Sequence, residues 1–418
     1  MNIEKIKGFA DIFPPESSAY AYMESRARRV FSRYGFMELR TPHLEFARLF
    51  QRSIGDDTDV VQKEMYVFPD SKGRAMALRP EATAGVMRAF IDSGLAARQQ
   101  ICRFFTIGAM FRHERPQKGR MRQFHQINCE CLGTQSPLAD AELICMLMKF
   151  LSSIGIESLS IQLNTLGCAQ CRPRFREALL EYLRALDATV LCDDCARRMK
   201  TNPLRILDCK KAACRELTED APHVFDYACP ECRTHFDAVL ELIAGANISH
   251  ALNYRLVRGL DYYCRTTFEV ISPDIGAQAA VAGGGRYDGL VKSLGGPDVP
   301  GVGFACGMER LALLMPKLPS APLDFYLLVM DPAYREQAFR LVQELRGADL
   351  AGEMNFVDGG FKSLMRQADK SGARFCLIYG PEEAAQQLLT VKDMVGGIQT
   401  KIAFDSLINY LKTGSSHD

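Results

Sequence analysis

The 418-residue sequence contains no tryptophan and almost no net charge. Its 51 lysines and arginines are balanced by 50 aspartates and glutamates, which gives a formal net charge of +1. A domain dedicated to nucleic acid usually carries a clear basic excess. Any contacts with RNA must therefore come from local patches. Because tryptophan is absent, phenylalanine, tyrosine and methionine must fill the aromatic and irregular positions of the core.

Long apolar runs are also missing. No stretch approaches the roughly 20 apolar residues of a transmembrane helix, and the first residues lack the hydrophobic core of a secretory signal. These absences predict a cytoplasmic protein that does not bind a membrane. In that compartment the 15 cysteines are expected to be free thiols or metal ligands rather than disulfides.

The pattern of apolar residues predicts an α/β chain with several domains. Residues 1–167 and 246–316 mix helices and strands, and we expect them to form one domain. Between them, residues 168–245 contain cysteine pairs and charged helical segments, which predicts an inserted helical domain. A proline-rich linker at 316–322 leads to residues 323–418, whose alternating strands and helices predict a small α/β domain with a mostly parallel sheet.

Two short motifs are unsuited to a hydrophobic core. The sequence RGLDYY occupies 258–263, and AGGGRYDG occupies 282–289. A run of glycines allows the backbone to approach a ligand where a Cβ atom would collide. Together the motifs predict a pocket for a small, polar, anionic ligand.

Basic residues gather in a predicted hairpin between residues 111 and 125. Arg112 lies at a strand end, where a planar guanidinium can bind a phosphate through two hydrogen bonds. Arg258 and Arg310 supply two further guanidinium groups from distant segments. The simpler interpretation of the hairpin alone is a solvated loop. Neither glycine-rich stretch fits the dinucleotide or P-loop pattern, so phosphate binding would depend on the arginines.

Motif by motif, the chain resembles the histidyl-tRNA synthetases, a family of class II aminoacyl-tRNA synthetases. Residues 34–42, 111–124 and 301–311 resemble class II motifs 1, 2 and 3. The stretch RPEAT at 79–83 and the two motifs described above resemble histidine-specific segments. The resemblance implies a catalytic domain with a mainly antiparallel sheet flanked by helices, a C-terminal anticodon-binding domain and, from motif 1, a homodimer.

The resemblance also implies an activity. The family joins L-histidine to ATP, with Mg²⁺, to form histidyl-adenylate, and then transfers histidine to the 3′ end of tRNA(His). Arg112 and Arg258 are the implied catalytic residues at the α-phosphate. Glu114 and Glu309 are implied ligands of nucleotide groups or magnesium, although they could simply orient arginines. The residues implied to bind ATP are Arg112, Glu114, Arg120, Phe124, Glu309 and Arg310.

The implied histidine-binding residues are Glu81, Thr83, Gln126, Glu130, Arg258, Tyr262 and Tyr263. The first three match ligands of the amino group, whereas Glu130 and Tyr263 match partners of the imidazole. An ordinary strand carboxylate is the simpler interpretation of Glu130, but its apolar neighbours suggest burial. Tyr262 and Tyr263 are adjacent, so we expect them on opposite faces of a strand, with Tyr262 in a packing or neighbouring contact role.

Two residues of the predicted hairpin, Arg115 and Gln117, are implied contacts of the acceptor end of tRNA. Two other protein classes remain as alternatives. A synthetase-like regulatory subunit of histidine biosynthesis typically lacks the anticodon domain and the histidine-specific motifs, and this chain has both. A structural zinc protein would explain the cysteines but not the arginines.

Eight cysteines form four closely spaced pairs between residues 168 and 232. Four pairs suffice for two four-cysteine zinc sites, although reduced thiols without a metal are the alternative. Spacing does not reveal which pairs would share an ion. Because the pocket arginines lie outside this segment, loss of zinc is expected to weaken tRNA charging more than adenylate formation. The candidate ligands are Cys168, Cys171, Cys192, Cys195, Cys209, Cys214, Cys229 and Cys232.

Overall fold

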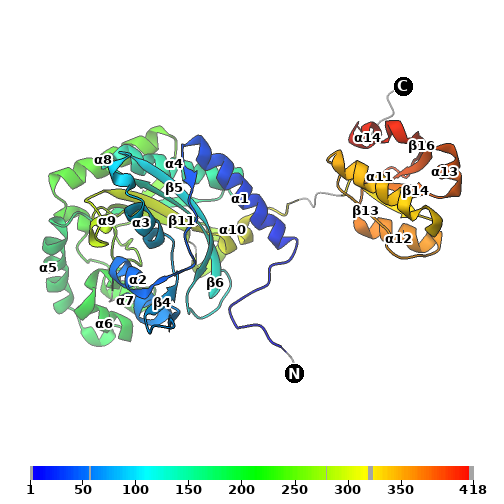
Figure 1. Ribbon diagram of the computed structural model, residues 1–418. Coiled ribbons are helices and arrows are strands. Elements are labelled where there is room, and N and C mark those ends of the chain that lie inside the picture. The colour runs from blue at the N-terminus through cyan, green and yellow to red at the C-terminus, as the bar shows by residue number, and fades with distance from the viewer. Residues whose placement is uncertain (1–2, 56–57, 279, 319–322, 414–418) are drawn as a thin grey trace. The chain divides into compact units, whose positions relative to one another are not determined.

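The computed structural model describes residues 3–55, 58–278, 280–318 and 323–413 (Figure 1). The chain forms two compact units, Met1–Leu318 and Pro319–Asp418. Among the helices in the described ranges, none combines the length and apolar character required to cross a lipid bilayer.

The first unit is built around an eight-stranded sheet with the order β1-β5-β6-β11-β10-β9-β7-β8. The two outermost pairs, β1–β5 and β7–β8, are parallel, and the five pairs between them are antiparallel. The expected mainly antiparallel sheet is therefore confirmed. The strands are β1 (Met37–Glu38), β5 (Cys102–Phe111), β6 (Gln123–Leu132), β7 (Ser160–Thr165), β8 (His250–Leu252), β9 (Cys264–Ile271), β10 (Ala280–Arg286) and β11 (Gly301–Gly307).

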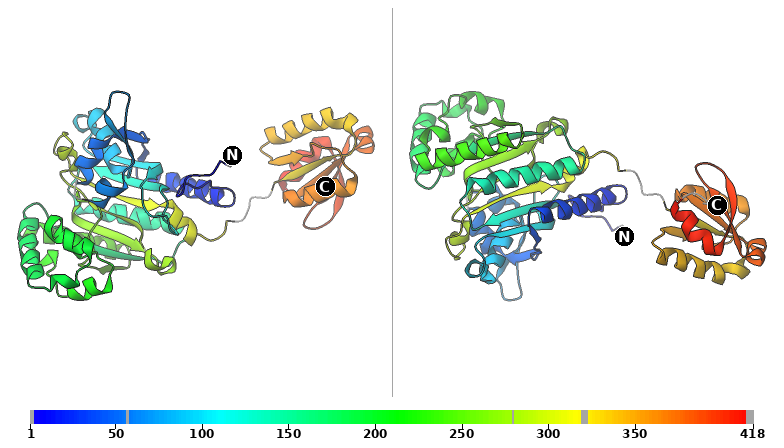
Figure 2. Two further views of the ribbon diagram at one scale, coloured as in Figure 1. Left: turned by 90° about the horizontal axis from the view of Figure 1, so that it is seen from below. Right: turned by 90° about the horizontal axis from the view of Figure 1, so that it is seen from above.

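Three helices, α1 (Glu16–Arg33), α4 (Pro137–Ser153) and α8 (Pro230–Gly245), lie side by side on one face of this sheet (Figure 2, right). The α1 helix buries apolar residues three or four positions apart, including Met23, Ala27 and Val30. At the start of α4, the side chain of Ser136 accepts a hydrogen bond from the Leu138 N–H, which satisfies a free donor of the first turn. These helices and the sheet enclose the main hydrophobic core.

The opposite face is covered by α2 (Ala47–Ile54), α3 (Thr83–Asp92) and a small sheet. The small sheet has the order β2 (Leu44–Phe46), β4 (Ala75–Leu78) and β3 (Val67–Pro69). Side chains alternate along a strand. On β6, Ile127 and Cys129 consequently join the main core, whereas Gln126 and Glu130 face α3 and the cavity described below. Polar residues of the site are thus kept out of the core by strand alternation alone.

The cysteine-rich segment leaves the sheet after β7 and returns at β8. It contains α5 (Cys171–Arg184), α6 (Asp193–Thr201), the short 3₁₀ helix η4 (Pro203–Ile206) and α7 (Ala212–Leu217), followed by α8. A small core of its own includes Phe175, Leu179 and Ile206. The α8 helix instead contributes Phe236 and Val239 to the main core. Helices α9 (Leu290–Ser293) and α10 (Met308–Leu314) complete the first unit.

The second unit has a five-stranded sheet with the order β13-β12-β14-β15-β16 and the helices α11, α12, α13 and α14. The predicted parallel arrangement is confirmed for three strands and was wrong for the other two. Strands β13, β12 and β14 run parallel to one another, whereas β15 and β16 are added antiparallel. Strands β15 and β16 form a hairpin whose turn is fixed by the Asp393 carboxylate, which accepts hydrogen bonds from two backbone N–H groups. The elements are β12 (Phe325–Val329), α11 (Arg335–Gly347), β13 (Gly352–Met354), α12 (Phe361–Ser371), β14 (Phe375–Tyr379), α13 (Pro381–Gln386), β15 (Leu388–Asp393), β16 (Gln399–Ala403) and α14 (Phe404–Thr413).

Candidate active site

A cavity of about 290 Å³ opens on the α3-facing side of the large sheet. Its walls come from the β5–β6 hairpin, the RGLDYY segment, β9, β10 and the junction of β11 with α10. Segments that lie far apart in the sequence therefore meet here. Eight residues singled out from the sequence line this cavity: Arg112, Glu114, Arg120, Phe124, Gln126, Arg258, Glu309 and Arg310.

Arg112 directly follows β5 and is fixed by several contacts. Its Nε donates to the carbonyl of Pro80 at 2.9 Å, and its guanidinium carbon lies 5.4 Å from the ring centroid of Phe124. The backbone N–H of Arg112 also donates to the carbonyl of Arg122 across the hairpin, at 2.8 Å. The hairpin thus presents a positioned cation beside a planar aromatic ring.

Arg310 reaches the same cavity from α10. Its Nε donates to the carbonyl of Gly119 at 3.3 Å, and its guanidinium also donates to the carbonyl of Ala280. Burial, and secondarily the nearby Arg120, lower the pKa of Arg310. Burial and repulsion between neighbouring arginines both disfavour the charged guanidinium. A site that nevertheless brings several arginines together favours an anionic ligand.

Arg258 forms an ion pair with Glu269 of β9, and its guanidinium carbon lies 5.5 Å from the ring centroid of Tyr263. The side chain crosses directly over the triple glycine. A Cβ atom on Gly283 would lie 2.3 Å from Nη1 of Arg258. One use of the glycine run is therefore to leave room for this arginine.

The other two glycines of the run serve the sheet itself. A Cβ atom on Gly284 would lie 2.1 Å from the carbonyl oxygen of Gly303, and one on Gly285 would lie 2.5 Å from that of Thr266. Gly285 also has a positive φ of 155°. Of the three glycines, Gly283 is the one that lines the cavity.

Next to the cavity, a buried polar cluster surrounds Glu130. Thr83 donates from Oγ1 to Oε1 of Glu130 at 2.7 Å, and the Tyr287 hydroxyl donates to the other carboxyl oxygen. Glu130 is 1% exposed, and this burial raises its pKa to about 8. Glu130 is therefore far from an ordinary strand carboxylate, because it is held between two hydroxyl donors.

Glu81 lies immediately before α3 and accepts hydrogen bonds from the backbone N–H groups of Thr83 and Ala84, each at 2.7 Å. This contact satisfies free donors of the first helical turn. Burial raises the pKa of Glu81. Gln126 lines the cavity, and its buried Oε1 accepts no hydrogen bond from the residues that the structure describes.

The two adjacent tyrosines do not lie on opposite faces of a strand, and that expectation was wrong. They precede β9, which begins at Cys264, so strand alternation does not apply to them. Their ring centroids are 4.6 Å apart, and those of Tyr262 and Tyr287 are 5.7 Å apart. Both rings pack in the aromatic wall beside Glu130.

Besides Glu269, two further carboxylates line the cavity, and both have partners in this structure. Glu309 accepts a hydrogen bond from the backbone N–H of His125 at 2.8 Å, and Glu114 forms an ion pair with Arg120 at 3.1 Å. Arg115 and Gln117 are exposed in the hairpin and lie outside the cavity lining.

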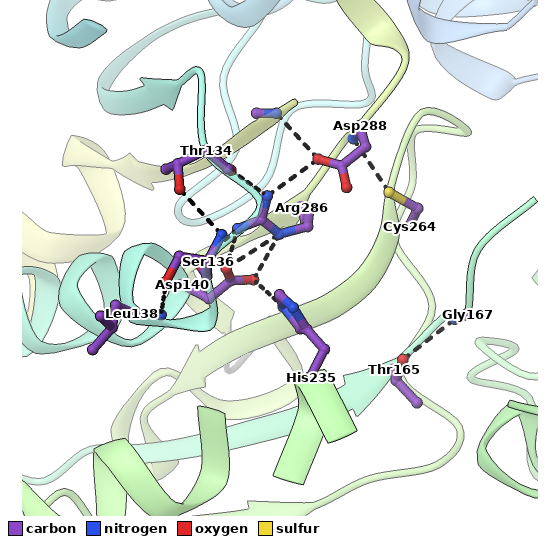
Figure 3. A network of polar contacts seen from close by, with 11 residues as sticks. Thr134, Ser136, Leu138, Asp140, Thr165, Gly167, His235, Cys264, Arg286 and Asp288 are labelled. Carbon is purple, nitrogen blue, oxygen red and sulfur yellow. Dashed lines mark hydrogen bonds and ion pairs between the residues drawn. The ribbon is translucent and has the colours of Figure 1, made fainter. Parts of the chain in front are cut away.

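Arg286 of the AGGGRYDG motif is fully buried and lies away from the cavity (Figure 3). It pairs with Asp140 of α4, which His235 of α8 contacts at 3.4 Å, and with Asp288 at 3.2 Å. Arg286 thereby ties β10 to two helices of the main core. Sequence reasoning missed this network, because Asp140 and Arg286 are 146 positions apart.

Sequence reasoning also missed Glu269 and Tyr287 as site residues. Glu269 lies on the same face of β9 as Thr267, between the buried residues Phe268 and Val270 of the opposite face. This alternation was the signal in the sequence that could have placed Glu269 on the face of the site. Tyr287 directly follows Arg286 within the quoted motif.

The eight paired cysteines form two separate groups, and the structure resolves which pairs lie together. Within each group, ligand sulfur atoms all lie within 4.8 Å of one another, so each group could hold a metal ion. All 15 cysteines of the chain are free thiols. The groups are Cys168, Cys171, Cys229 and Cys232, and Cys192, Cys195, Cys209 and Cys214.

Comparison with known proteins identifies the family. The histidyl-tRNA synthetase family model matches residues 8–311, and the model named anticodon binding domain matches residues 324–414. A histidine–tRNA ligase of Nitratidesulfovibrio vulgaris is 60% identical over 97% of each chain, and one of Geobacter sulfurreducens is 47% identical over 96% of this chain and 97% of the relative. The crystal structure of apo histidyl-tRNA synthetase from S. aureus aligns with a TM-score of 0.82 and 30% identity, over 99% of this chain and 100% of that one. The chain belongs to the histidyl-tRNA synthetase family.

Proposed function

We propose that this protein activates L-histidine with ATP and transfers the histidyl group to the 3′ end of tRNA(His). The observation that carries the proposal is the convergence of Arg112, Arg258 and Arg310 on one cavity beside the Glu130 cluster. The relatives named histidine–tRNA ligase, which align over nearly the whole chain, support the same activity.

The arginines suit the first half-reaction. The carboxylate of histidine attacks the α-phosphorus of ATP, the bond to the bridging oxygen breaks, and pyrophosphate leaves with the electron pair. Negative charge spreads over phosphate oxygens during this displacement, and positioned cations stabilise it. We assign Arg112 and Arg258 to the α-phosphate and Arg310 to the γ-phosphate. Phe124 would stack on adenine, with Arg120 and Glu114 beside it.

The Glu130 cluster suits the side chain of histidine. Glu130 and Tyr263 would pair with the imidazole nitrogens, whereas Gln126, Thr83 and Glu81 would receive the ammonium group. The unpaired Oε1 of Gln126 supports this assignment. A site of paired hydrogen bonds rejects analogues that lack them, since buried polar groups would then be left unsatisfied. Tyr262 completes the aromatic wall.

Magnesium would enter with ATP and would neutralise part of the phosphate charge. Glu114 and Glu309 are the carboxylates predicted to reach it, and carboxylate oxygens are suitable ligands for Mg²⁺. In this structure Glu114 pairs with Arg120, and Glu309 accepts a hydrogen bond from the His125 N–H. The two carboxylates would therefore also orient the basic residues around the cavity. Zinc at the cysteines would have a structural role, since no cysteine lines the cavity.

The remaining assignments extend the proposal to tRNA and assembly. Arg115 and Gln117 lie on an exposed hairpin where they could contact the acceptor end of tRNA. We assign residues 1–167 and 246–316 to the catalytic domain, 168–245 to the insertion and 323–418 to anticodon binding. A homodimer and a cytoplasmic location remain predictions.

A regulatory subunit of histidine biosynthesis is not favoured. One solved structure with both descriptions, an ATP phosphoribosyltransferase regulatory subunit/histidyl-tRNA synthetase from Bacillus halodurans, shares 18% identity at a TM-score of 0.66, which supports the common fold alone. The relatives at 47–60% identity are named histidine–tRNA ligase, and residues 324–414 match the anticodon-binding model.

Exchange of radioactive pyrophosphate into ATP tests the proposal. The purified protein should catalyse this exchange with histidine, but not with glutamine or phenylalanine, and should then charge a tRNA(His) transcript. Histidine binding without exchange or charging would support the regulatory alternative instead.

A further inference from the structure

The two cysteine groups have the spacing of metal ligands. We call Cys168, Cys171, Cys229 and Cys232 cluster I, and Cys192, Cys195, Cys209 and Cys214 cluster II. Sulfur–sulfur distances are 3.5 and 4.0 Å in cluster I and 3.9 Å in cluster II. A tetrahedral zinc ion with Zn–S bonds of about 2.3 Å holds its sulfurs about 3.8 Å apart. A disulfide bond would require a separation of roughly 2 Å, so these sulfurs are placed as ligands rather than as bonded pairs.

Backbone donors support the sulfurs in both clusters. The N–H of Cys229 donates to Sγ of Cys171 at 3.1 Å, and that of Cys192 donates to Sγ of Cys214 at 3.3 Å. Such hydrogen bonds orient the sulfur toward the ion. In each cluster the four ligands come from two chain segments, which an ion would join.

The ligand set narrows the choice of metal. Four thiolates with no oxygen or nitrogen donor form a soft, tetrahedral, closed site, which is typical of structural Zn²⁺. Iron is the main competitor for such a site.

The chain between the two cysteine pairs of cluster II contacts the RGLDYY segment. Arg205 donates from Nη1 to the carbonyl of Arg258 at 2.8 Å, and Asn202 donates from Nδ2 to Oδ1 of Asp261 at 2.8 Å. Cys195 precedes this stretch and Cys209 follows it, so one ion would hold both of its ends.

Cluster I reaches the same segment through Arg172. Arg172 directly follows Cys171, and its guanidinium donates to the carbonyl of Tyr263 and, at 3.5 Å, to that of Asp261. Both clusters therefore hold side chains against the backbone that carries Arg258.

We propose that each cluster binds one structural Zn²⁺ ion and that these ions, through Arg205, Asn202 and Arg172, position Arg258 for adenylate formation. The contacts of Arg205, Asn202 and Arg172 with the RGLDYY segment revise the expectation that loss of zinc weakens tRNA charging more than adenylate formation. Adenylate formation should fall as well, because the loop that presents Arg258 loses its support. The kinetic part rests on the proposed function, whereas the zinc content does not.

Elemental analysis of the full-length protein, purified anaerobically without chelator, tests the sites directly. We expect two zinc ions per chain. Cys209→Ser and Cys229→Ser should each reduce the content to about one, since the clusters share no ligand. Cys376→Ser, which replaces a buried cysteine of the second unit, should leave the zinc content unchanged.

Should a cysteine variant fail to fold, Co²⁺ exchanged into the wild-type protein should give the absorption of tetrahedral thiolate sites. Less than one zinc per chain with eight freely titrating thiols, or iron in place of zinc, would overturn the proposal.

Kinetics test the positioning role separately. Arg205→Ala and Asn202→Ala should keep both zinc ions but lower kcat for pyrophosphate exchange by about tenfold to a hundredfold, with little change in the KM for histidine. Arg205→Lys, which keeps a donor, should recover part of the rate. Arg184→Ala, an exposed arginine of α5, is the matched control. Equal kcat values for Arg205→Ala and Arg184→Ala would contradict the positioning role. A wild-type protein with two zinc ions and no exchange would contradict the proposed function and leave the zinc sites standing.

Discussion

Arg258 and Glu269 form an ion pair in the wall of the cavity, with the arginine stacked 5.5 Å from the ring of Tyr263. The pair fixes the position of the guanidinium in the cavity wall. Preorganised charge of this kind avoids reorganisation during the reaction. We therefore expect Arg258 to act mainly on the reacting phosphate rather than to anchor the substrate.

Arg258→His should preserve histidine binding and slow adenylate formation. The positive charge is needed chiefly as the phosphate reacts, so the loss should appear in kcat, by about a hundredfold. Single-turnover kinetics with a separate measurement of histidine affinity will distinguish the two effects. Loss of affinity with unchanged chemistry would assign Arg258 to substrate binding instead.

Glu130 should make stability depend on pH. Burial raises its pKa from 4.5 to about 8, so the folded protein retains a proton that the unfolded chain releases. This contribution to stability is complete below pH 4.5 and is lost as pH rises through 8. The glutamine of Glu130→Gln cannot ionise, so this variant lacks the pH-dependent loss. The stability of wild type should fall relative to the variant by up to ~1.4 kcal/mol per pH unit. Calorimetry from pH 5 to 8.5 should therefore show the Tm of the variant rising relative to that of wild type.

The control for this prediction is Glu157→Gln, which replaces an exposed carboxylate of the same unit. Its Tm should differ from that of wild type by a constant amount across the range. A constant difference for Glu130→Gln as well would show that Glu130 does not titrate as proposed.

Two adjacent glycines of β10 should respond differently to alanine. In Gly283→Ala the new Cβ meets the movable end of the Arg258 side chain, so the protein should fold but exchange pyrophosphate more slowly. In Gly284→Ala it meets the Gly303 carbonyl and the Phe304 Cα, which cannot yield easily, and stability should fall by about 1–3 kcal/mol. Denaturation curves and exchange rates for both variants check this contrast. Full stability of Gly284→Ala would contradict the tight approach of β10 and β11.

Dimerisation is predicted from the motif 1 resemblance. Sedimentation at micromolar concentration should give a species of twice the 46.7 kDa chain mass. A single species with the mass of one chain would contradict the prediction of a homodimer.

Much of the site could be predicted from the sequence because its residues lie within short motifs. Alternation along β6 places Phe124, Gln126 and Glu130 on one face, and the structure has them there. Contacts between distant segments could not be predicted. The Glu269 partner of Arg258 is an example, since neither residue specifies the other.

The fold shows the same distinction between local patterns, which could be predicted, and contacts between distant segments, which could not. A long helix such as α1 carries its own signal, because its apolar residues recur at helical spacing. The antiparallel direction of β15 was not predicted, because a helix between two strands usually indicates parallel neighbours, yet β15 follows α13 and pairs antiparallel with β14. Likewise, cysteine spacing alone did not reveal that Cys168 and Cys171 lie beside Cys229 and Cys232.

The most direct test of the account is histidine-dependent pyrophosphate exchange by Arg112→Ala and Arg310→Ala, with exposed Arg98→Ala as the control. Each cavity arginine is expected to contribute ~3 kcal/mol to transition-state stabilisation, so exchange should fall about a hundredfold while circular dichroism shows an intact fold. The Arg98→Ala variant should retain the wild-type rate. Near-normal exchange by both cavity variants would contradict the claim that these arginines hold the reacting phosphates.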